Sequence, residues 1–269
     1  MGPRNRAIAE TALITGASSG IGAALARRFA RAGFNLVLVA RSADKLKALA
    51  TSLSDTHGVK TSVVAADLAL PEAAKKLAVS MKRARRRIDV LVNNAGVAEY
   101  GPFVKMHAAR HRELIALNVA GLTAMLAHFV PPMVARRRGR VLNVASIAAF
   151  QPVPLLATYA ATKAYVLSLT ESLSEELKGT GVSITALCPG ITATHMLDAA
   201  RRDSKELTKL PGFVVGAAEA VADEGFDACL RGEVIRVPGA LNRAATLAAG
   251  ATPKWLLRRV GGAIARGMK

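Results

Sequence analysis

Thr15-Gly16-Ala17-Ser18-Ser19-Gly20-Ile21-Gly22 is the stretch of this sequence that decides the fold. A short apolar run at residues 11–15 leads into it, and a helical pattern over residues 21–32 follows, ending before Gly33. Glycines between a strand and a helix allow a tight turn and a close approach of the backbone to a phosphate. The free N–H groups of the helix then face that phosphate. The stretch therefore predicts a dinucleotide-binding loop, although a plain strand-to-helix turn can carry a similar pattern.

Apolar runs alternate with helical patterns over most of the chain. Two of the helical stretches are long and end near Arg136 and Lys178. The expected strands are residues 11–15, 35–40, 61–66, 88–92, 140–145, 182–187 and 233–237. Continuous apolar strands alternating with helices are typical of a parallel sheet covered on both faces. We therefore predict an α/β fold, a single Rossmann-type domain over residues 1–269 with a doubly wound parallel sheet of about seven strands.

Two segments depart from this alternation. Residues 195–212 are polar, and we expect them to form a lid over the substrate site. The tail, residues 240–269, is rich in Ala, Leu and Arg, and residues 255–260 could form a basic amphipathic helix. Such a helix could bind a membrane surface or a partner, but packing against its own domain or a sister subunit is favoured.

The composition excludes several classes of protein. Hydrophobic residues make up 51% and charged residues 21%, which excludes a disordered chain. The net charge of +18 could serve nucleic-acid or anionic-membrane binding. The arginine triplets at residues 85–87 and 136–138 instead fall where helices are expected to end, and there cations complement the helix dipole. The arginines are scattered and lack interleaved aromatic residues, so we expect no nucleic-acid partner. A solvated basic surface is favoured over a membrane-binding one.

Cysteine and histidine spacing indicates neither a disulfide framework nor a metal site. Cys188 and Cys229 are isolated, and no His/Cys cluster has the spacing of metal ligands. The first ten residues do not resemble a signal peptide, and we expect no apolar run of the length needed to cross a bilayer. We therefore expect a cytoplasmic protein without a metal.

Ordered motifs over residues 11–239 resemble the short-chain dehydrogenase/reductase family. The loop at residues 15–22 matches the family's T-G-x-x-x-G-x-G, and residues 93–96 match its N-N-A-G. Tyr159 and Lys163 match its Y-x-x-x-K, Ser146 ends the fifth strand, and Asn118 stands at the place of the catalytic Asn. The resemblance implies an oxidoreductase that transfers a hydride between a nicotinamide and a carbonyl or secondary alcohol. It also implies dimers or tetramers assembled through the helices at residues 109–136 and 157–178.

The resemblance assigns roles residue by residue. The catalytic residues are Asn118, Ser146, Tyr159 and Lys163, with Asn118 holding a water that links Lys163 to solvent. The cofactor-binding residues are Thr15, Gly16, Ser18, Ser19, Gly20, Ile21, Gly22, Arg41, Ser42, Asp67, Leu68, Asn94, Ala95, Gly96, Tyr159, Lys163, Pro189, Gly190, Thr192 and Thr194.

The Tyr–Lys pair has a chemical reason. A free tyrosine has a pKa of about 10 and is a poor base at neutral pH. Tyr159 and Lys163 are four residues apart, so on a helix they share one face. A nearby ammonium stabilises the phenolate and is expected to lower the pKa of Tyr159. Ser146 is expected to hydrogen-bond the substrate oxygen and to hold it for Tyr159.

The end of the second strand predicts which nicotinamide is bound. A site for NAD needs an acidic residue there to accept a hydrogen bond from the ribose 2′-hydroxyl. This chain has Ala40 at that position, followed by Arg41 and Ser42. Arginine pairs well with phosphate, so the sequence predicts NADP(H).

The substrate class is only partly indicated. Residues 97–103 and 147–154 are expected to line the pocket, and the second stretch is mostly apolar. This favours a hydrophobic ketone, aldehyde or alcohol, whereas the basic residues of the lid could select an anionic group. Two other functions stay open: a non-catalytic NADP-binding regulator, and a peripheral membrane enzyme that reduces lipid carbonyls.

Overall fold

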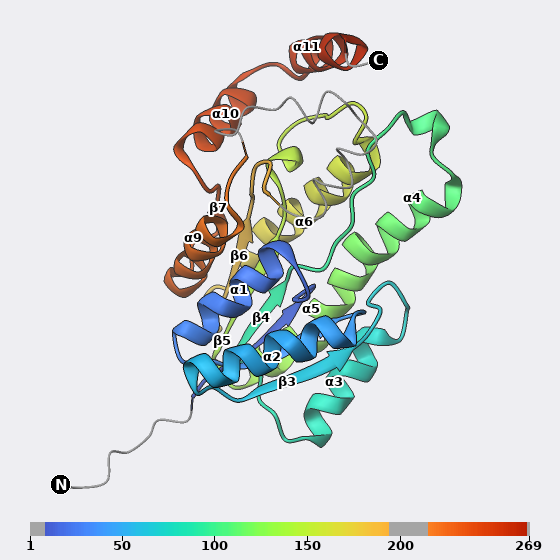
Figure 1. Ribbon diagram of the computed structural model, residues 1–269. Coiled ribbons are helices and arrows are strands. Elements are labelled where there is room, and N and C mark those ends of the chain that lie inside the picture. Colours follow the sequence, from blue (N-terminus) through green and yellow to red (C-terminus); the bar gives the residue numbers. More distant parts are fainter. Residues whose placement is uncertain (1–8, 194–214, 268–269) are drawn as a thin grey trace, which may run out of the picture.

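Seven parallel strands form the centre of the protein in the computed structural model, which describes residues 9–193 and 215–267 (Figure 1). The sheet order is β3-β2-β1-β4-β5-β6-β7, and every pairing is parallel. The strands are β1 Thr11–Thr15, β2 Asn35–Ala40, β3 Thr61–Ala65, β4 Val90–Asn93, β5 Gly139–Val144, β6 Val182–Leu187 and β7 Ile235–Arg236. The predicted doubly wound Rossmann-type domain is confirmed.

Helices cover both faces of this sheet (Figure 1). The helices are α1 Gly20–Arg31, α2 Ala43–His57, α3 Ala73–Arg83, α4 Ala108–Ile115, α5 Leu122–Ala135, α6 Ala157–Glu176, α9 Ala218–Arg231, α10 Ala240–Ala251 and α11 Lys254–Gly267. Short turns of helix are η1 Phe103–Lys105 and η3 Ile147–Ala149, and a π-helical segment, η2 Ala116–Gly121, joins α4 to α5.

Alternate side chains of each strand enter two separate cores. Ala12 and Ile14 of β1 pack with α1, α2 and α9 on one face, whereas Leu13 packs with α3, α5 and α6 on the other. On the first face, Phe29 of α1 meets Phe226 of α9 edge to face, with ring centroids 4.8 Å apart. Burial on both faces explains why the strands are continuous apolar runs.

The continuous helical stretch Ala108–Ala135 corrects one expectation. By length and composition it is apolar enough to cross a membrane, although the sequence had suggested no such run. It packs Met125, Phe129 and Met133 into the core beneath the sheet. Only 39% of its most apolar window is buried, and Ile115 on this stretch is 48% exposed.

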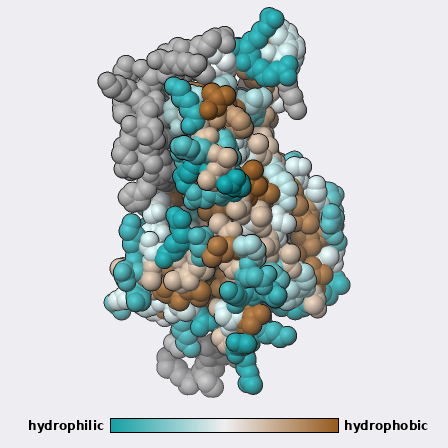
Figure 2. Space-filling model, turned by 90° about the vertical axis from the view of Figure 1, so that its right-hand side faces the viewer, coloured by the Kyte–Doolittle hydropathy of each residue, from teal (hydrophilic) through white to brown (hydrophobic). Residues whose placement is uncertain are grey.

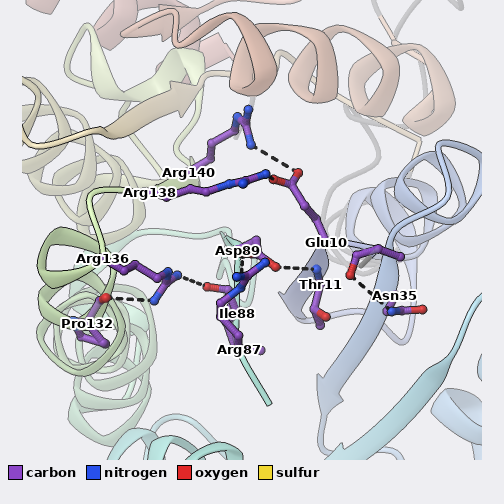
Figure 3. Close-up of polar contacts among 11 residues, drawn as sticks. Glu10, Thr11, Asn35, Arg87, Ile88, Asp89, Pro132, Arg136, Arg138 and Arg140 are labelled. Atoms are coloured by element: carbon purple, nitrogen blue, oxygen red, sulfur yellow. Dashed lines mark hydrogen bonds and ion pairs between the residues drawn. The ribbon is translucent and has the colours of Figure 1, made fainter. Parts of the chain in front are cut away.

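An ion-pair network ties the strands together at their amino ends (Figure 3). The carboxylate of Asp89, 2% exposed, accepts a hydrogen bond from the Thr11 amide at 3.0 Å and pairs with Nε of Arg87 at 2.8 Å. Glu10 pairs with Arg138 at 2.6 Å and Arg140 at 3.4 Å. One arginine of each triplet, Arg87 and Arg138, is therefore engaged with a carboxylate of the protein itself.

Asp89→Asn is expected to lower the free energy of unfolding by about 1–3 kcal/mol, because an amide cannot accept from both donors and leaves one of them unpaired. Urea unfolding measures this loss. Asp44→Asn is the matched control, since that carboxylate is fully exposed and lies 4.0 Å from Lys47, and it should leave the midpoint unchanged. Equal midpoints for the wild type and Asp89→Asn would contradict the assigned role.

Candidate active site

The candidate active site lies where β1, β4, β5 and β6 end. The strand order reverses between β1 and β4, because β2 follows on one side of β1 and β4 lies on the other. In open parallel sheets, ligands bind in the crevice outside the carboxyl ends of the strands at this reversal. The predicted loop, the N-N-A-G stretch, Ser146 and the Pro-Gly stretch each follow one of these strands.

Glycine is required at two positions of the loop between β1 and α1. Gly16 has a φ of +65°, in the left-handed region that favours glycine. A Cβ on Gly22 would lie 2.2 Å from the carbonyl oxygen of Gly16, so no side chain fits between the loop and the first turn of α1. The close packing brings the amino end of α1 directly against the loop.

The amino end of α1 is open to a ligand. Ser19 is the N-cap of α1, yet its side chain makes no capping hydrogen bond. The N–H groups of this end therefore have no side-chain cap, as a site for an anionic group requires. Ser18, Ser19, Gly20 and Ile21 thus surround a position suited to the pyrophosphate of a dinucleotide.

Thr15 and Asn94 lock the loop to the neighbouring strand. The Thr15 hydroxyl donates to the carbonyl of Val92 and accepts from the amides of Asn94 and Ala95, both at 3.0 Å. The Asn94 side chain donates to the carbonyls of Thr15 and Gly16 at 3.0 and 3.2 Å. Thr15 and Asn94 therefore fix the conformation of the loop and hold it against the residues that follow β4.

At the end of β2, Arg41 and Ser42 have free polar groups. Both are exposed, and Arg41 makes no hydrogen bond or ion pair with the described part of the chain. Ser42 caps α2 without a side-chain hydrogen bond. After β3, Asp67 accepts a hydrogen bond from the Ala69 amide, and the buried Leu68 packs its carbonyl against Gly121. These residues border the same edge of the site.

Tyr159 and Lys163 lie one turn apart on α6, as predicted. Nζ of Lys163 is 5.7 Å from the centroid of the Tyr159 ring and donates to the carbonyl of Val144 at 2.8 Å. Ser146 follows β5 and caps η3, with its Oγ accepting from the Ala148 amide at 3.1 Å. A hydrogen bond links Ser146 to Tyr159. The structure thus brings the serine, tyrosine and lysine together at one point.

Burial governs the ionisation of this pair. It raises the pKa of the Tyr159 phenol, and the hydrogen bond with Ser146 offsets part of that rise. It lowers the pKa of Lys163 to about 8, because the side chain is only 5% exposed. The lysine was expected to lower the tyrosine pKa. Burial instead raises that pKa, and the ammonium is directed at the Val144 carbonyl.

Asn118 lies in the π-helical segment η2 and is 2% exposed. Its Oδ1 accepts from the Val97 amide at 3.0 Å, and its Nδ2 donates to the Val97 carbonyl and the Thr162 hydroxyl. A Cβ on Gly96 would lie 3.2 Å from that Oδ1 and 3.5 Å from Nζ of Lys163. Asn118 therefore fixes the strand end beside Lys163, and π-helical segments are frequent at functional sites.

The segment after β6 completes the site. The Pro189 carbonyl accepts from the Ile147 amide at 2.9 Å, which joins this segment to the serine loop. Thr192 is buried and donates to the Gly190 carbonyl at 3.0 Å. Thr194 and the expected lid at residues 195–212 lie outside the described residues. Within the described part, no three His, Cys, Asp or Glu residues are grouped to hold a metal.

Two residues beside the site were missed by the sequence analysis. Asn242 of α10 lies over Gly190, where a Cβ would come within 2.6 Å of its side-chain amide. His111 of α4 places Nδ1 2.7 Å from the Thr158 hydroxyl, next to Tyr159, and its ring lies against Phe103. Neither stands in a motif, so only the tertiary structure could reveal them.

Comparisons with known proteins show the family to which this chain belongs. The family model for short chain dehydrogenase matches residues 10–205. Hydroxysteroid dehydrogenase-like protein 1 of Gallus gallus is 33% identical over 80% of this chain and 65% of its own length. Very-long-chain 3-oxoacyl-CoA reductase of Rattus norvegicus is 32% identical over 90% of this chain and 76% of its own. A solved short-chain dehydrogenase from Sphingobium yanoikuyae in complex with NADPH is 37% identical, covers 90% of this chain and 93% of that one, and has a TM-score of 0.80.

Proposed function

The chain belongs to the short-chain dehydrogenase/reductase family of oxidoreductases, and on that premise we propose an NADP(H)-dependent enzyme that uses Tyr159 as the acid/base. The observation that carries the proposal is the grouping of Ser146, Tyr159 and Lys163 at the carboxyl edge of the sheet, the edge from which the glycine loop also emerges. The bound nicotinamide supplies or takes up the hydride. The protein's part is to position the substrate carbonyl and to move one proton.

Each catalytic side chain has a defined task. Ser146 donates a hydrogen bond to the substrate oxygen and orients it toward Tyr159. Tyr159 gives its phenolic proton to that oxygen as negative charge develops, or takes it back in the opposite direction. Because burial raises the pKa of Tyr159, the phenol is protonated at neutral pH and is ready to act as an acid. The protonated phenol is the form that carbonyl reduction uses, and the phenolate is the form that alcohol oxidation uses.

Lys163 and Asn118 support the proton transfer. The Lys163 ammonium stabilises negative charge on the phenolate after the proton has left. With a pKa of about 8, this amine can itself exchange a proton near neutral pH. Asn118 positions the end of β4 beside that amine and orders the water through which the proton reaches solvent.

The cofactor preference rests on Arg41 and Ser42. Both offer unengaged donors at the end of β2, and no acidic side chain occupies the position of Ala40. A guanidinium binds a ribose 2′-phosphate through charge-assisted hydrogen bonds. A fluorescence titration with NADPH and, separately, NADH tests the preference. Tighter binding of NADPH supports it, preference for NADH overturns it, and binding of neither would overturn the enzymatic assignment as well.

Arg41→Ala is expected to weaken NADPH binding by about 1–3 kcal/mol and to leave NADH binding nearly unchanged, because only NADPH carries the 2′-phosphate. Lys47→Ala is the matched control, since it removes the same charge from an exposed position of the adjoining helix α2. Equal losses for both cofactors in Arg41→Ala, or an equal NADPH loss in Lys47→Ala, would contradict a specific contact.

The substrate we propose is an apolar carbonyl compound. The segment around η3 carries Ala148, Phe150 and Pro154, and the Gly101 amide donates to the Leu155 carbonyl at 2.8 Å, joining the two expected walls. The names of two similar proteins refer to a hydroxysteroid and to a very-long-chain 3-oxoacyl-CoA; the steroid and the acyl chain are apolar, whereas the CoA group is anionic. Loss of nicotinamide absorbance with bulky apolar ketones, compared with small polar ketones, tests this class.

We also propose that the enzyme is a dimer or tetramer assembled through α4, α5 and α6. Ile115 and Tyr165 are exposed on these helices, and the apolar stretch Ala108–Ala135 is only partly covered. Figure 2 looks onto this side and shows apolar patches between the hydrophilic residues. Sedimentation velocity of the purified protein tests the assembly, and a monomer at micromolar concentration would exclude it.

A further inference from the structure

The two helices after β7 lie outside the layers that cover the sheet (Figure 1). Leu241 and Leu247 of α10 are 62% and 76% exposed, and Trp255 and Leu256 at the start of α11 are 54% and 39% exposed. Single exposed apolar side chains are ordinary, but several large ones in one short segment indicate a surface that contacts something apolar.

This segment is also uniformly basic. Residues 240–269 contain six Lys or Arg residues, and no Asp or Glu follows Glu233 in the chain. Arg258 and Arg259 are exposed, and the guanidinium of Arg259 lies 5.6 Å from the centroid of the Trp255 ring. A helix that combines an exposed tryptophan and leucines with arginines, and carries no acid, has the chemistry of a helix lying in the interface of an anionic bilayer.

The same helices rest on the candidate active site. Asn242 at the start of α10 packs over Gly190, in the segment after β6 that completes the site. In α11, a Cβ on Gly261 would lie 3.4 Å from Pro154, which belongs to the expected wall of the substrate pocket. Whatever covers α10 and α11 therefore lies next to the site where the substrate would bind.

We propose that α10 and α11 form a docking surface for a bilayer of anionic phospholipid. A second copy of this tail is a poorer occupant, because two such tails would bring the same basic surfaces together without an acidic side chain between them. An anionic bilayer offers negative headgroups for the arginines and acyl chains for Trp255 and the leucines. Docking itself is independent of the redox chemistry. Direct entry of an apolar substrate from the bilayer is a consequence that rests on the proposed function.

Trp255 reports on this docking directly, because it is the only tryptophan in the chain. The full-length protein is titrated with vesicles of phosphatidylcholine containing phosphatidylglycerol, and in parallel with vesicles of pure phosphatidylcholine. We expect a blue shift of tryptophan emission and co-sedimentation with the anionic vesicles only. Both should decline as salt is raised, since salt screens the attraction between the arginines and the headgroups.

Two double variants separate the contributions of charge and apolar contact. Arg258→Glu/Arg259→Glu should lower partitioning onto anionic vesicles by at least about tenfold, because each basic residue near an anionic surface adds to binding. Leu241→Ser/Leu247→Ser keeps Trp255 and should also reduce partitioning. The matched control is Lys82→Glu/Arg83→Glu, an adjacent exposed basic pair at the end of α3, and it should bind like the wild type.

Folding and the redox activity are monitored independently. Circular dichroism and NADPH titration of each variant show whether the sheet domain is intact, so a failure of the proposed function is distinguishable from a failure of docking. No emission shift and no sedimentation of the wild type with anionic vesicles would overturn the proposal. An equal loss in the α3 control would also overturn it, since docking would then follow net charge alone. Dissociation of an oligomer by Arg258→Glu/Arg259→Glu, without vesicle binding by the wild type, would assign the surface to a second copy instead.

Discussion

Replacing Tyr159 with phenylalanine is expected to lower turnover by about 10²–10⁴-fold, the usual contribution of a positioned acid or base, while NADPH affinity stays unchanged. The substitution removes the phenolic hydroxyl that is hydrogen-bonded to Ser146 and leaves the ring in place on α6. The Lys163 amine donates a hydrogen bond to the Val144 carbonyl at 2.8 Å, so its proton is directed away from the substrate oxygen that Ser146 and Tyr159 are proposed to hold. Steady-state kinetics with a ketone substrate and a separate NADPH titration measure the two effects.

The same helix provides a matched control. Tyr165 lies less than two turns after Tyr159, with its hydroxyl 2.9 Å from that of Thr123 on α5, away from the strand ends. Tyr165→Phe removes an identical hydroxyl, keeps the aromatic ring on the proposed assembly surface, and should keep full turnover. Normal turnover in Tyr159→Phe would exclude the phenol as the acid/base. A large loss of NADPH affinity in Tyr159→Phe would mean that the ring environment, and not the proton, had been damaged.

The strands were predictable because burial on both faces makes each of them an uninterrupted apolar run. The residues at which the strands begin and end were less predictable. The fourth strand was expected at residues 88–92, but β4 is Val90–Asn93, because Ile88 and Asp89 are held by arginines at the amino edge of the sheet. The last strand was expected at residues 233–237, but β7 pairs only over Ile235–Arg236. A strand at the edge has one neighbour, so fewer of its residues are held in the ladder.

The candidate site was predictable where a local motif carries the chemistry. Gly16 and Gly22 follow from the geometry of a strand-to-helix turn, and Tyr159 and Lys163 follow from helical spacing. The direction of the Lys163 amine was not predictable, because the carbonyl that accepts its hydrogen bond belongs to Val144, which lies on strand β5 and not on α6. The prediction for the tail, residues 240–269, is limited in the same way. Its basic apolar composition is visible in the sequence, but its exposure and its contact with Gly190 appear only when distant segments are brought together.

Lys163→Met is expected to abolish most of the activity and to make the cofactor-free protein more stable at neutral pH. The pKa of Lys163 falls from the ordinary value of a lysine to about 8, because burial disfavours the ammonium. Below pH about 8 both the folded and the unfolded chains carry the charge, and the folded state bears its full desolvation cost. Between about 8 and about 10.4 the unfolded chain still holds a proton that the folded chain has released, so the free energy of unfolding rises with pH.

The difference in the free energy of unfolding between the wild type and Lys163→Met reports the titration of Lys163 alone, because every other group titrates in both proteins. Urea unfolding should show Lys163→Met more stable than the wild type by about 1–3 kcal/mol below pH about 8, with the gap narrowing as pH rises toward about 10.4. Lys178→Met, a highly exposed lysine just after α6, should show no such gap. A variant less stable than the wild type at neutral pH would show that the hydrogen bond to Val144 outweighs the desolvation cost.

The pH dependence of activity in Lys163→Met is a second test of the role of Lys163. Alcohol oxidation needs the phenolate of Tyr159, and without the ammonium the pKa of that phenol, already raised by burial, has no nearby cation to lower it. The residual oxidation rate should therefore reach its maximum at higher pH than in the wild type. An unshifted optimum together with lower activity would assign Lys163 to cofactor binding alone. A shifted optimum together with a gain in stability would show that the buried ammonium serves the acid/base and, at the same time, lowers the free energy of unfolding.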